Sequence, residues 1–296
     1  MSTTRRLERR LGDWMRARLP YWAAELVMFL LKMGWSALFG LSLLVAIIAT
    51  KLLWSEDMPL HRYDLLVIIA VGLQVLFLAF KLETWAEARV ILVFHLTGTA
   101  MEIFKVQAGS WSYPEPGVLK LFGIPLFSGF MYASVGSFMA RTIRVFDMRF
   151  APYPPYWVTL LLAVAIYVNF FAHHFLPDIR VALFAATVLL FARTRIWFRT
   201  GDTHYWMPLP LSALLSALFL WVAENIGTMT GTWVYSGQAR LELVSLGKLG
   251  SWYLLLYVAF VTVTLVVRKP LSRAPLVRED LTTTGRAAPP RPAEAG

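Results

Sequence analysis

Two short stretches of this sequence place a glutamate before the same set of small and aromatic residues. They are AMEIFKVQAGSWSY, at 100–113, and VAENIGTMTGTWVY, at 222–235. In each stretch Gly follows the glutamate by seven residues, Trp by nine and Tyr by eleven. A carboxylate in apolar surroundings can exchange a proton with a bound molecule, and aromatic faces can stabilise a cation. The pattern therefore suggests acid–base chemistry with Glu102 and Glu224 as the candidate acids.

Three interpretations of these glutamates remain open. In the first, both lie in water at the level of the lipid headgroups, and the aromatic residues of the two stretches are interfacial anchors. In the second, the glycine lets the chain turn back, and each carboxylate accepts hydrogen bonds from its own turn as a structural cap. In the third, both acids share a cavity, where they cannot easily ionise together, so one pKa rises and a proton donor results. The aromatic residues concerned are Trp111, Tyr113, Trp233 and Tyr235.

Other polar residues could line an outer-facing cavity beside the glutamates. These further candidates for substrate binding are His95, Asn169, His173 and Asn225. His95 and Glu102 are seven residues apart and would share one helical face, as would Asn169 and His173, which are four apart.

Neither a metal site nor a cofactor is predicted from these residues. The sequence lacks HxxxH, HExxH or comparable ligand spacing, and the adjacent His173 and His174 would point to different faces of a helix. It also lacks a phosphate-binding loop and a nucleophile elbow.

The composition indicates that membrane helices carry these residues. Hydrophobic residues make up 58% of the chain and charged residues only 16%, which is too apolar for an ordinary soluble domain. The long, unbroken apolar runs favour helices over the alternating pattern of a membrane barrel. There is no cysteine, which excludes disulfides and thiolate metal sites. The net charge of +10 is explained by membrane topology, so no nucleic-acid partner is predicted.

The apolar runs predict an all-α, polytopic transmembrane bundle of about eight spans. The predicted spans are 23–50, 65–82, 89–106, 119–143, 156–176, 180–198, 208–228 and 248–267. If the N-terminus is cytoplasmic, most Lys and Arg residues fall on the inner side of the membrane. We therefore expect a bacterial inner-membrane protein in contact with lipids, with both termini in the cytoplasm.

The two glutamate stretches also suggest an internal duplication, because they end the third and the seventh predicted spans. The expected parts are a basic cytoplasmic N-terminus (1–20), a first four-helix half (21–150), a second four-helix half (151–267) and a disordered cytoplasmic tail (268–296). An even number of helices in each half would insert both halves the same way up. Glu102 and Glu224 would then lie at similar depth.

Two longer blocks resemble a known family. They are FHLTGTAMEIFKVQAGSWSYPEPGVLKLFGIPLFSGFMYASVGS, which begins at Phe94, and WVAENIGTMTGTWVYSGQ, which begins at Trp221. Over roughly 18–268, the sequence resembles the YoaT-like family of bacterial integral membrane proteins, a domain of unknown function. The resemblance implies a multi-pass membrane protein and assigns no catalytic residue.

A looser likeness concerns the chemistry. The Glu and Gly-x-Trp-x-Tyr elements are similar to those of membrane carotenoid cyclases and hydratases of the heterodimeric lycopene cyclase type. This likeness implies protonation of a polyene, with Glu102 and Glu224 as acids and Trp111 and Trp233 as π faces. The sequence lacks the Pro-x-Glu-Glu type of element of those cyclases.

Three functions are compatible with these features. The first is an enzyme that modifies an isoprenoid or similar lipid by acid–base chemistry, in a dry pocket open sideways to lipid. The second is a transporter or small-molecule-binding protein that uses the same cavity, with a water path to both faces of the membrane. The third is a structural membrane protein whose carboxylates face bulk water. The substrate and the oligomeric state are not predicted.

Overall fold

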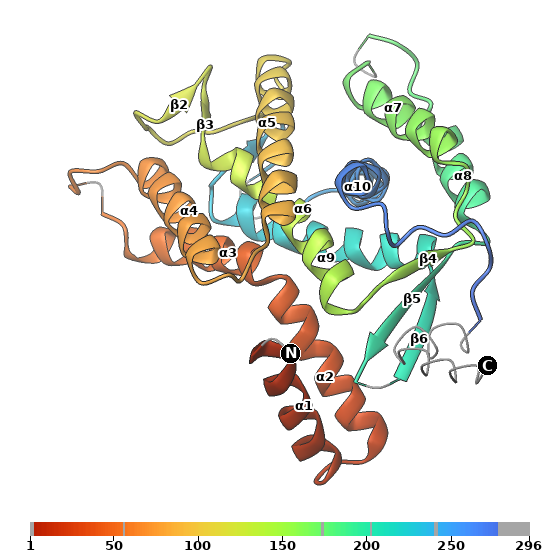
Figure 1. Ribbon diagram of the computed structural model, residues 1–296. Helices are drawn as coiled ribbons and strands as arrows, with labels where there is room; N and C mark the ends of the chain where they lie inside the picture. The colour runs from red at the N-terminus through yellow and green to blue at the C-terminus, as the bar shows by residue number, and fades with distance from the viewer. Residues whose placement is uncertain (1–2, 56, 173–174, 202, 240–241, 278–296) are drawn as a thin grey trace, which may run out of the picture.

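The computed structural model describes residues 3–55, 57–172, 175–201, 203–239 and 242–277, and it is mostly helical (Figure 1). The helices are α1 (Thr3–Arg16), α2 (Tyr21–Ser36), α3 (Leu38–Leu53), α4 (Arg62–Ala79), α5 (Trp85–Gln107), α6 (Phe127–Val145), α7 (Tyr156–Ala172), α8 (Arg180–Phe191), α9 (Leu209–Met229) and α10 (Leu246–Val266). The strands are β1 (Trp111–Ser112), β2 (Lys120–Leu121), β3 (Ile124–Pro125), β4 (Arg149–Ala151), β5 (Arg195–Thr200), β6 (Thr203–Pro208) and β7 (Val234–Tyr235).

Within the described residues, four helices are long and apolar enough to cross a membrane: α4, α5, α9 and α10. The pair α2 and α3, bent by 69°, would count as a fifth span if it is taken as one. The predicted number of eight spans is therefore not supported. Helices α7 and α8 have only 17 and 12 residues, and a 12-residue helix is about 18 Å long against a hydrocarbon core of about 30 Å.

Helix α6 is long enough to span but is more polar than the other long helices. It carries Arg141 and Arg144 among several Ser, Thr and Gly residues. Arg141 is fully buried and pairs with Glu83 at 2.9 Å, and Arg144 pairs with Glu87 at 2.8 Å. Pairing with a carboxylate is how a buried arginine such as Arg141 is accommodated in an apolar interior.

Short strands correct the expectation of an all-α fold. The antiparallel sheet β4-β5-β6 forms where the sequence predicted the end of a helix and a loop. Strand β5, RIWFRT, is rich in aromatic and branched residues that suit a strand. The first part of the predicted disordered tail joins this sheet, because the Phe150 N–H donates to the Pro270 carbonyl at 2.9 Å and Leu271 bridges to Phe150. The tail from 278 onward lies outside the described residues.

The helix layout does not support two repeated four-helix halves. In the described parts, 21–150 contains the five helices α2 to α6, whereas 151–267 contains the four helices α7 to α10. The connections differ as well, because α8 and α9 are joined through strands β5 and β6, whereas α4 and α5 are joined by 80–84.

Helices α5 and α9, which carry the glutamates, both contact α10, and α10 lies between the α5–α6 pair and the α7–α8 pair (Figure 1). Helices α5 and α6 approach closely because glycine, which has no side chain, leaves room for a large side chain of the opposite helix. A Cβ on Gly98 would lie 2.6 Å from the Tyr132 side chain, and one on Gly136 would lie 2.7 Å from Phe94. This close approach brings Tyr132 of α6 against the C-terminal half of α5.

Candidate functional site

Glu102, near the C-terminal end of α5, is buried and accepts three side-chain hydrogen bonds. Trp111 Nε1 donates to Oε2 at 2.8 Å, and the Tyr113 hydroxyl donates to the same oxygen at 2.9 Å. The Tyr132 hydroxyl, from α6, donates to Oε1 at 2.6 Å. Only 2% of Glu102 is exposed, so it is not the solvated headgroup-level residue of the first interpretation.

Glu224, near the C-terminal end of α9, has the same arrangement. Trp233 Nε1 donates to Oε1 at 3.1 Å, and the Tyr235 hydroxyl donates to the same oxygen. Trp252 Nε1, from α10, donates to Oε2 at 2.9 Å. Glu224 is 7% exposed. In both sites, therefore, one carboxylate oxygen takes two donors from the following loop and the other takes one donor from a neighbouring helix.

The same helix ending delivers the loop donors to both sites. Gly109 and Gly231 have φ angles of 71° and 66°, in the left-handed region that glycine adopts without strain. The N–H of Ser110 then bonds back to the carbonyl of Lys105 at 2.9 Å, and that of Thr232 bonds back to Gly227 at 3.0 Å. These bonds close a Schellman motif after each helix and turn the chain back toward the carboxylate. The aromatic residues are thus donors to glutamate rather than surface anchors.

The two stretches meet in a short antiparallel strand pair. Trp111 of β1 lies opposite Tyr235 of β7, and Ser112 lies opposite Val234. The Trp111 and Tyr235 ring centroids are 5.7 Å apart. Lys248 of α10 places its Nζ 5.5 Å from the Trp111 ring centroid and 3.9 Å from that of Tyr235. The two sites therefore share an aromatic layer, and a cation lies against it.

The loop tyrosines remain protonated donors. Burial raises the pKa of Tyr113 well above its usual value, and the Glu102 carboxylate raises it further. Burial and the Glu224 carboxylate raise the pKa of Tyr235 in the same way. The more distant carboxylate adds a smaller upward shift to each pKa, Glu224 on Tyr113 and Glu102 on Tyr235. Each site is therefore within the electrostatic reach of the other.

Tyr132 and Trp252, the helix-borne donors of the two sites, line one cavity. This cavity, the central cavity, has a volume of about 70 Å³ and lies among α5, α6, α7, α9 and α10. The centroids of the two rings are 6.4 Å apart. Glu102 and Glu224 are not among the lining residues and contact the cavity through these two donors. The remaining lining is mostly apolar and includes Phe94, Met101, Val135, Leu220, Leu255 and Ala259.

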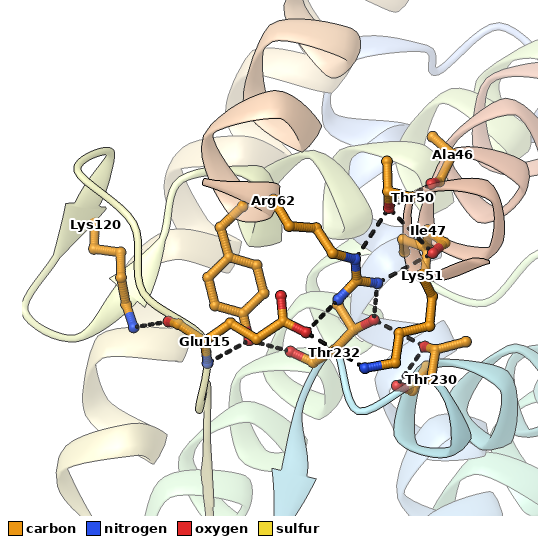
Figure 2. A network of polar contacts seen from close by, with 11 residues as sticks. Ala46, Ile47, Thr50, Lys51, Arg62, Glu115, Lys120, Thr230 and Thr232 are labelled. Atoms are coloured by element: carbon orange, nitrogen blue, oxygen red, sulfur yellow. Dashed lines mark hydrogen bonds and ion pairs between the residues drawn. The ribbon is translucent and has the colours of Figure 1, made fainter. Parts of the chain in front are cut away.

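One buried arginine ties together the loops that carry the donors (Figure 2). Arg62, at the start of α4, donates to Glu115 Oε1 at 2.7 Å and to Thr232 Oγ1 at 3.0 Å. Glu115 lies two residues after Tyr113, and Thr232 directly precedes Trp233. Arg62 therefore acts as a positioning residue for both glutamate sites.

The same arginine also binds the C-terminal end of α3 (Figure 2). Its guanidinium donates to Thr50 Oγ1 and to the Ile47 carbonyl, both at 3.1 Å. Next to it, the Tyr63 hydroxyl donates to the Thr232 carbonyl at 2.8 Å. The ends of α3 and α4 are thereby fixed to the loop that follows α9.

Three other predicted binding residues, His95, Asn169 and Asn225, do not line the central cavity. His95 packs against α6, with its ring 4.5 Å from the ring of Phe130. Asn169 binds the segment that starts α8, because its Nδ2 donates to Asp178 and its Oδ1 accepts from the Ile179 N–H, both at 3.1 Å. These contacts position helices.

Asn225 also has a structural contact, although it follows Glu224 directly. Its Oδ1 accepts from the Val244 N–H at 2.9 Å and so holds the segment that leads into α10. His173 lies outside the described residues. Among the residues that the structure describes, no group of three or more His, Asp or Glu side chains could hold a metal ion.

Sequence reasoning missed Tyr132, Trp252 and Arg62. One signal for the first two was present, because they follow their glutamates by 30 and 28 residues. Their different residue types concealed the correspondence. Arg62 belongs to no sequence motif, and its partners lie 12 to 170 residues away along the chain.

Comparisons with known proteins place both glutamate stretches inside a matched region. A family model described as "Protein of unknown function (DUF817)" matches residues 25–260. The chain is similar to the "Uncharacterized protein YoaT" of Bacillus subtilis (strain 168), with 43% identity over 235 residues, which cover 78% of this chain and 88% of that protein. No solved structure matches. The resemblance to a YoaT-like family is therefore confirmed, whereas neither match concerns a carotenoid cyclase or hydratase.

Proposed function

This chain belongs to the DUF817 family, and from its two glutamate sites we propose that it is a membrane enzyme that binds an apolar lipid chain and performs acid–base chemistry on it. The observation that carries the proposal is the position of Tyr132. Its hydroxyl donates to Glu102 at 2.6 Å, while its side chain lines the central cavity. A phenol both donates and accepts hydrogen bonds, so Tyr132 can pass a proton between Glu102 and a molecule in the cavity.

The reaction class that fits this arrangement is the shift of a double bond in an isoprenoid or similar unsaturated lipid. The reacting form has Glu102 protonated, with its O–H donating to the Tyr132 oxygen while the Tyr132 O–H points to the bound lipid. Tyr132 gives its hydroxyl proton to one carbon of the double bond and takes the Glu102 proton in its place, which leaves a Glu102 carboxylate. The resulting carbocation loses a proton from a neighbouring carbon, and that proton returns through Tyr132 to Glu102. Atoms and charge balance without a co-reactant. The aromatic lining, including Phe94 and Trp252, supplies π faces that favour the cation.

Glu224 has a different role in this proposal. Its contact with the central cavity is Trp252, and an indole N–H only donates, so it cannot relay a proton. Glu224 instead fixes the Trp252 ring as one wall of the cavity. The sequence-based hypothesis of two equivalent acids is thus narrowed to one acid, Glu102, and one positioning residue.

The proposal includes a location and an origin for the sites. We infer that both termini are cytoplasmic in a bacterial inner membrane and that the glutamate sites lie toward the outer side, because Lys and Arg concentrate at the opposite ends of the helices. The matching helix endings and donors support a duplication confined to the α5–α6 and α9–α10 pairs. Since the chain lacks cysteine, single cysteines at Ser236 and Ser272 would test the orientation with a membrane-impermeant maleimide.

The function is tested by lipid extraction and mass spectrometry on a strain that lacks the gene. The strain is complemented with the wild type, Tyr132→Phe, Glu102→Gln or Tyr205→Phe. Tyr205→Phe is the matched control, because it removes a tyrosine–glutamate hydrogen bond away from the site, from Tyr205 of β6 to Glu25 of α2 at 3.3 Å. We expect the wild type and the control to restore the altered lipids and the two site variants to fail at equal protein levels.

The outcomes separate the alternatives. If Tyr132→Phe restores every altered lipid, the relay through Tyr132 is wrong. If the lipids of the deletion strain do not change at all, the enzyme hypothesis is wrong, and the protein binds a molecule in the cavity without modifying it. Thermal unfolding of the purified variants in detergent confirms that the site variants are folded.

A further inference from the structure

A second apolar cavity lies next to the central cavity, and the two share the lining residue Leu256 of α10. It has a volume of about 130 Å³ and lies among α2, α6, α9, α10 and the sheet β4-β5-β6, and we call it the sheet-side cavity. Resting on the proposed function, we propose that one linear apolar chain occupies both cavities, with its reacting end at Tyr132 and its tail beyond Leu256.

On both α6 and α9, one part of the helix lines the central cavity and the adjacent part lines the sheet-side cavity. On α6, Tyr132 and Val135 line the central cavity, and the lining of the sheet-side cavity extends to Ile143. On α9, Leu220 lines the first, and the lining of the second reaches back to Leu209. The stretch of α6 from Tyr132 to Ile143 is about 16 Å long. The combined space is therefore elongated, which fits an extended chain better than a compact ring system.

The sheet-side cavity has side chains suited to a flexible hydrocarbon. Four methionines line it, and their unbranched, polarizable side chains adapt to irregular apolar ligands. Small residues of α9 leave the room that the chain would fill, among them Ala213 and Ser216. An apolar cavity of roughly this size can hold a benzene-sized molecule, so several carbons of a chain fit. The methionines are Met33, Met139, Met148 and Met207.

This arrangement makes chain length a determinant of binding. A short chain fills only the central cavity and makes no contact beyond Leu256. A long chain gains the apolar contacts of the sheet-side cavity, and the burial of each additional methylene contributes to its affinity. Blocking the sheet-side cavity should therefore weaken the binding of long chains selectively.

The test uses photo-crosslinking of the purified full chain in detergent, with octanol and hexadecanol probes that carry a diazirine at the end of the chain. Ser216→Phe fills the sheet-side cavity. Leu214→Phe is the matched control, because it adds the same ring to the exposed side of α9, where Leu214 is 48% exposed. We expect Ser216→Phe to reduce hexadecanol labelling about tenfold and to leave octanol labelling unchanged. In the wild type, hexadecanol should label the peptides that contain Met139, Met148 or Met207.

Unchanged hexadecanol labelling in Ser216→Phe, or wild-type hexadecanol labels confined to the central cavity, would overturn the inference. If Ser216→Phe does not fold, Ala213→Leu adds a smaller group to the same cavity and should give the same selective loss. The labelling reports binding alone. If Tyr132→Phe and Glu102→Gln still restore the altered lipids while labelling remains dependent on chain length, the chemistry at Glu102 is overturned and the two-cavity inference stands.

Discussion

The glutamate sites at the ends of α5 and α9 have the same first two donors and differ in the third. Each carboxylate accepts from a loop Trp and a loop Tyr, and then from Tyr132 in one site and Trp252 in the other. Tryptophan only donates, whereas tyrosine also accepts. One residue on a neighbouring helix therefore decides whether a buried carboxylate is closed off or connected to the central cavity. The following predictions test where the two sites are alike and where they differ.

The largest effect is expected from removing either carboxylate. Glu102→Ala and Glu224→Ala each leave three buried or half-buried donors without an acceptor, and we expect each to lower the free energy of unfolding by about 3–5 kcal/mol. Chemical unfolding of the purified protein in detergent measures this. Similar losses would show that both carboxylates stabilise the fold equally. A loss below about 1 kcal/mol at one site would mean that water reaches its donors.

Removal of Arg62 should loosen both sites together. Arg62→Met deletes buried hydrogen bonds to both donor loops, and we expect a loss of about 3 kcal/mol in the free energy of unfolding. Lys51→Met is the matched control, because Lys51 is half-exposed and lies 3.7 Å from the same Glu115, so its loss should cost less than about 1 kcal/mol.

Hydrogen exchange of the indole N–H groups shows whether both loops respond to Arg62→Met. We expect Trp111 and Trp233 to exchange faster by a similar factor, because Arg62 binds next to both loops. Acceleration at one indole only would show that Arg62 positions a single site.

The sequence predicted the parts of these sites that depend on local geometry. Gly at seven residues after each glutamate marks the left-handed helix ending, because that backbone conformation favours glycine wherever it occurs. The contacts of Tyr132 and Trp252 could not be predicted in this way. They depend on how closely neighbouring helices approach, and in the first site the approach requires Gly98 opposite the Tyr132 ring.

The fold, like the sites, could be predicted only in its local features. The apolar runs marked the positions of helices, but they did not show which helices are long enough to span or that α2 and α3 are bent. Strand β5 was taken as the end of a helix because a short apolar run fits both structures. Its pairing with β4, where Phe150 lies opposite Ile196, is a long-range contact that local sequence does not encode.

A smaller effect is expected from high pH. The raised pKa values mean that the folded protein keeps the phenolic protons of Tyr113 and Tyr235, whereas the unfolded chain releases them near pH ~10. The contribution to stability is complete below pH ~10 and declines above it, by about 1.4 kcal/mol per pH unit for each tyrosine. Tyr113→Phe and Tyr235→Phe should each make the decline shallower by a similar amount in unfolding measured across this range. An unchanged slope in one variant would mean that its tyrosine already loses the proton in the folded protein.

The smallest effect concerns the glycines that end the two helices. Gly109→Ala and Gly231→Ala place a Cβ in the left-handed region, and we expect each to lower the free energy of unfolding by about 1 kcal/mol. A Cβ would meet no atom within 4 Å at Gly109 and only the flexible Lys51 Nζ, at 3.8 Å, at Gly231, so backbone strain alone sets the cost. Gly72→Ala, within helix α4 and also in open space, is the control and should stabilise the protein by about 0.5–1 kcal/mol. Equal costs at the two helix ends would leave Tyr132 and Trp252 as the difference between the sites, whereas unequal costs would show that the sites already differ in their backbones.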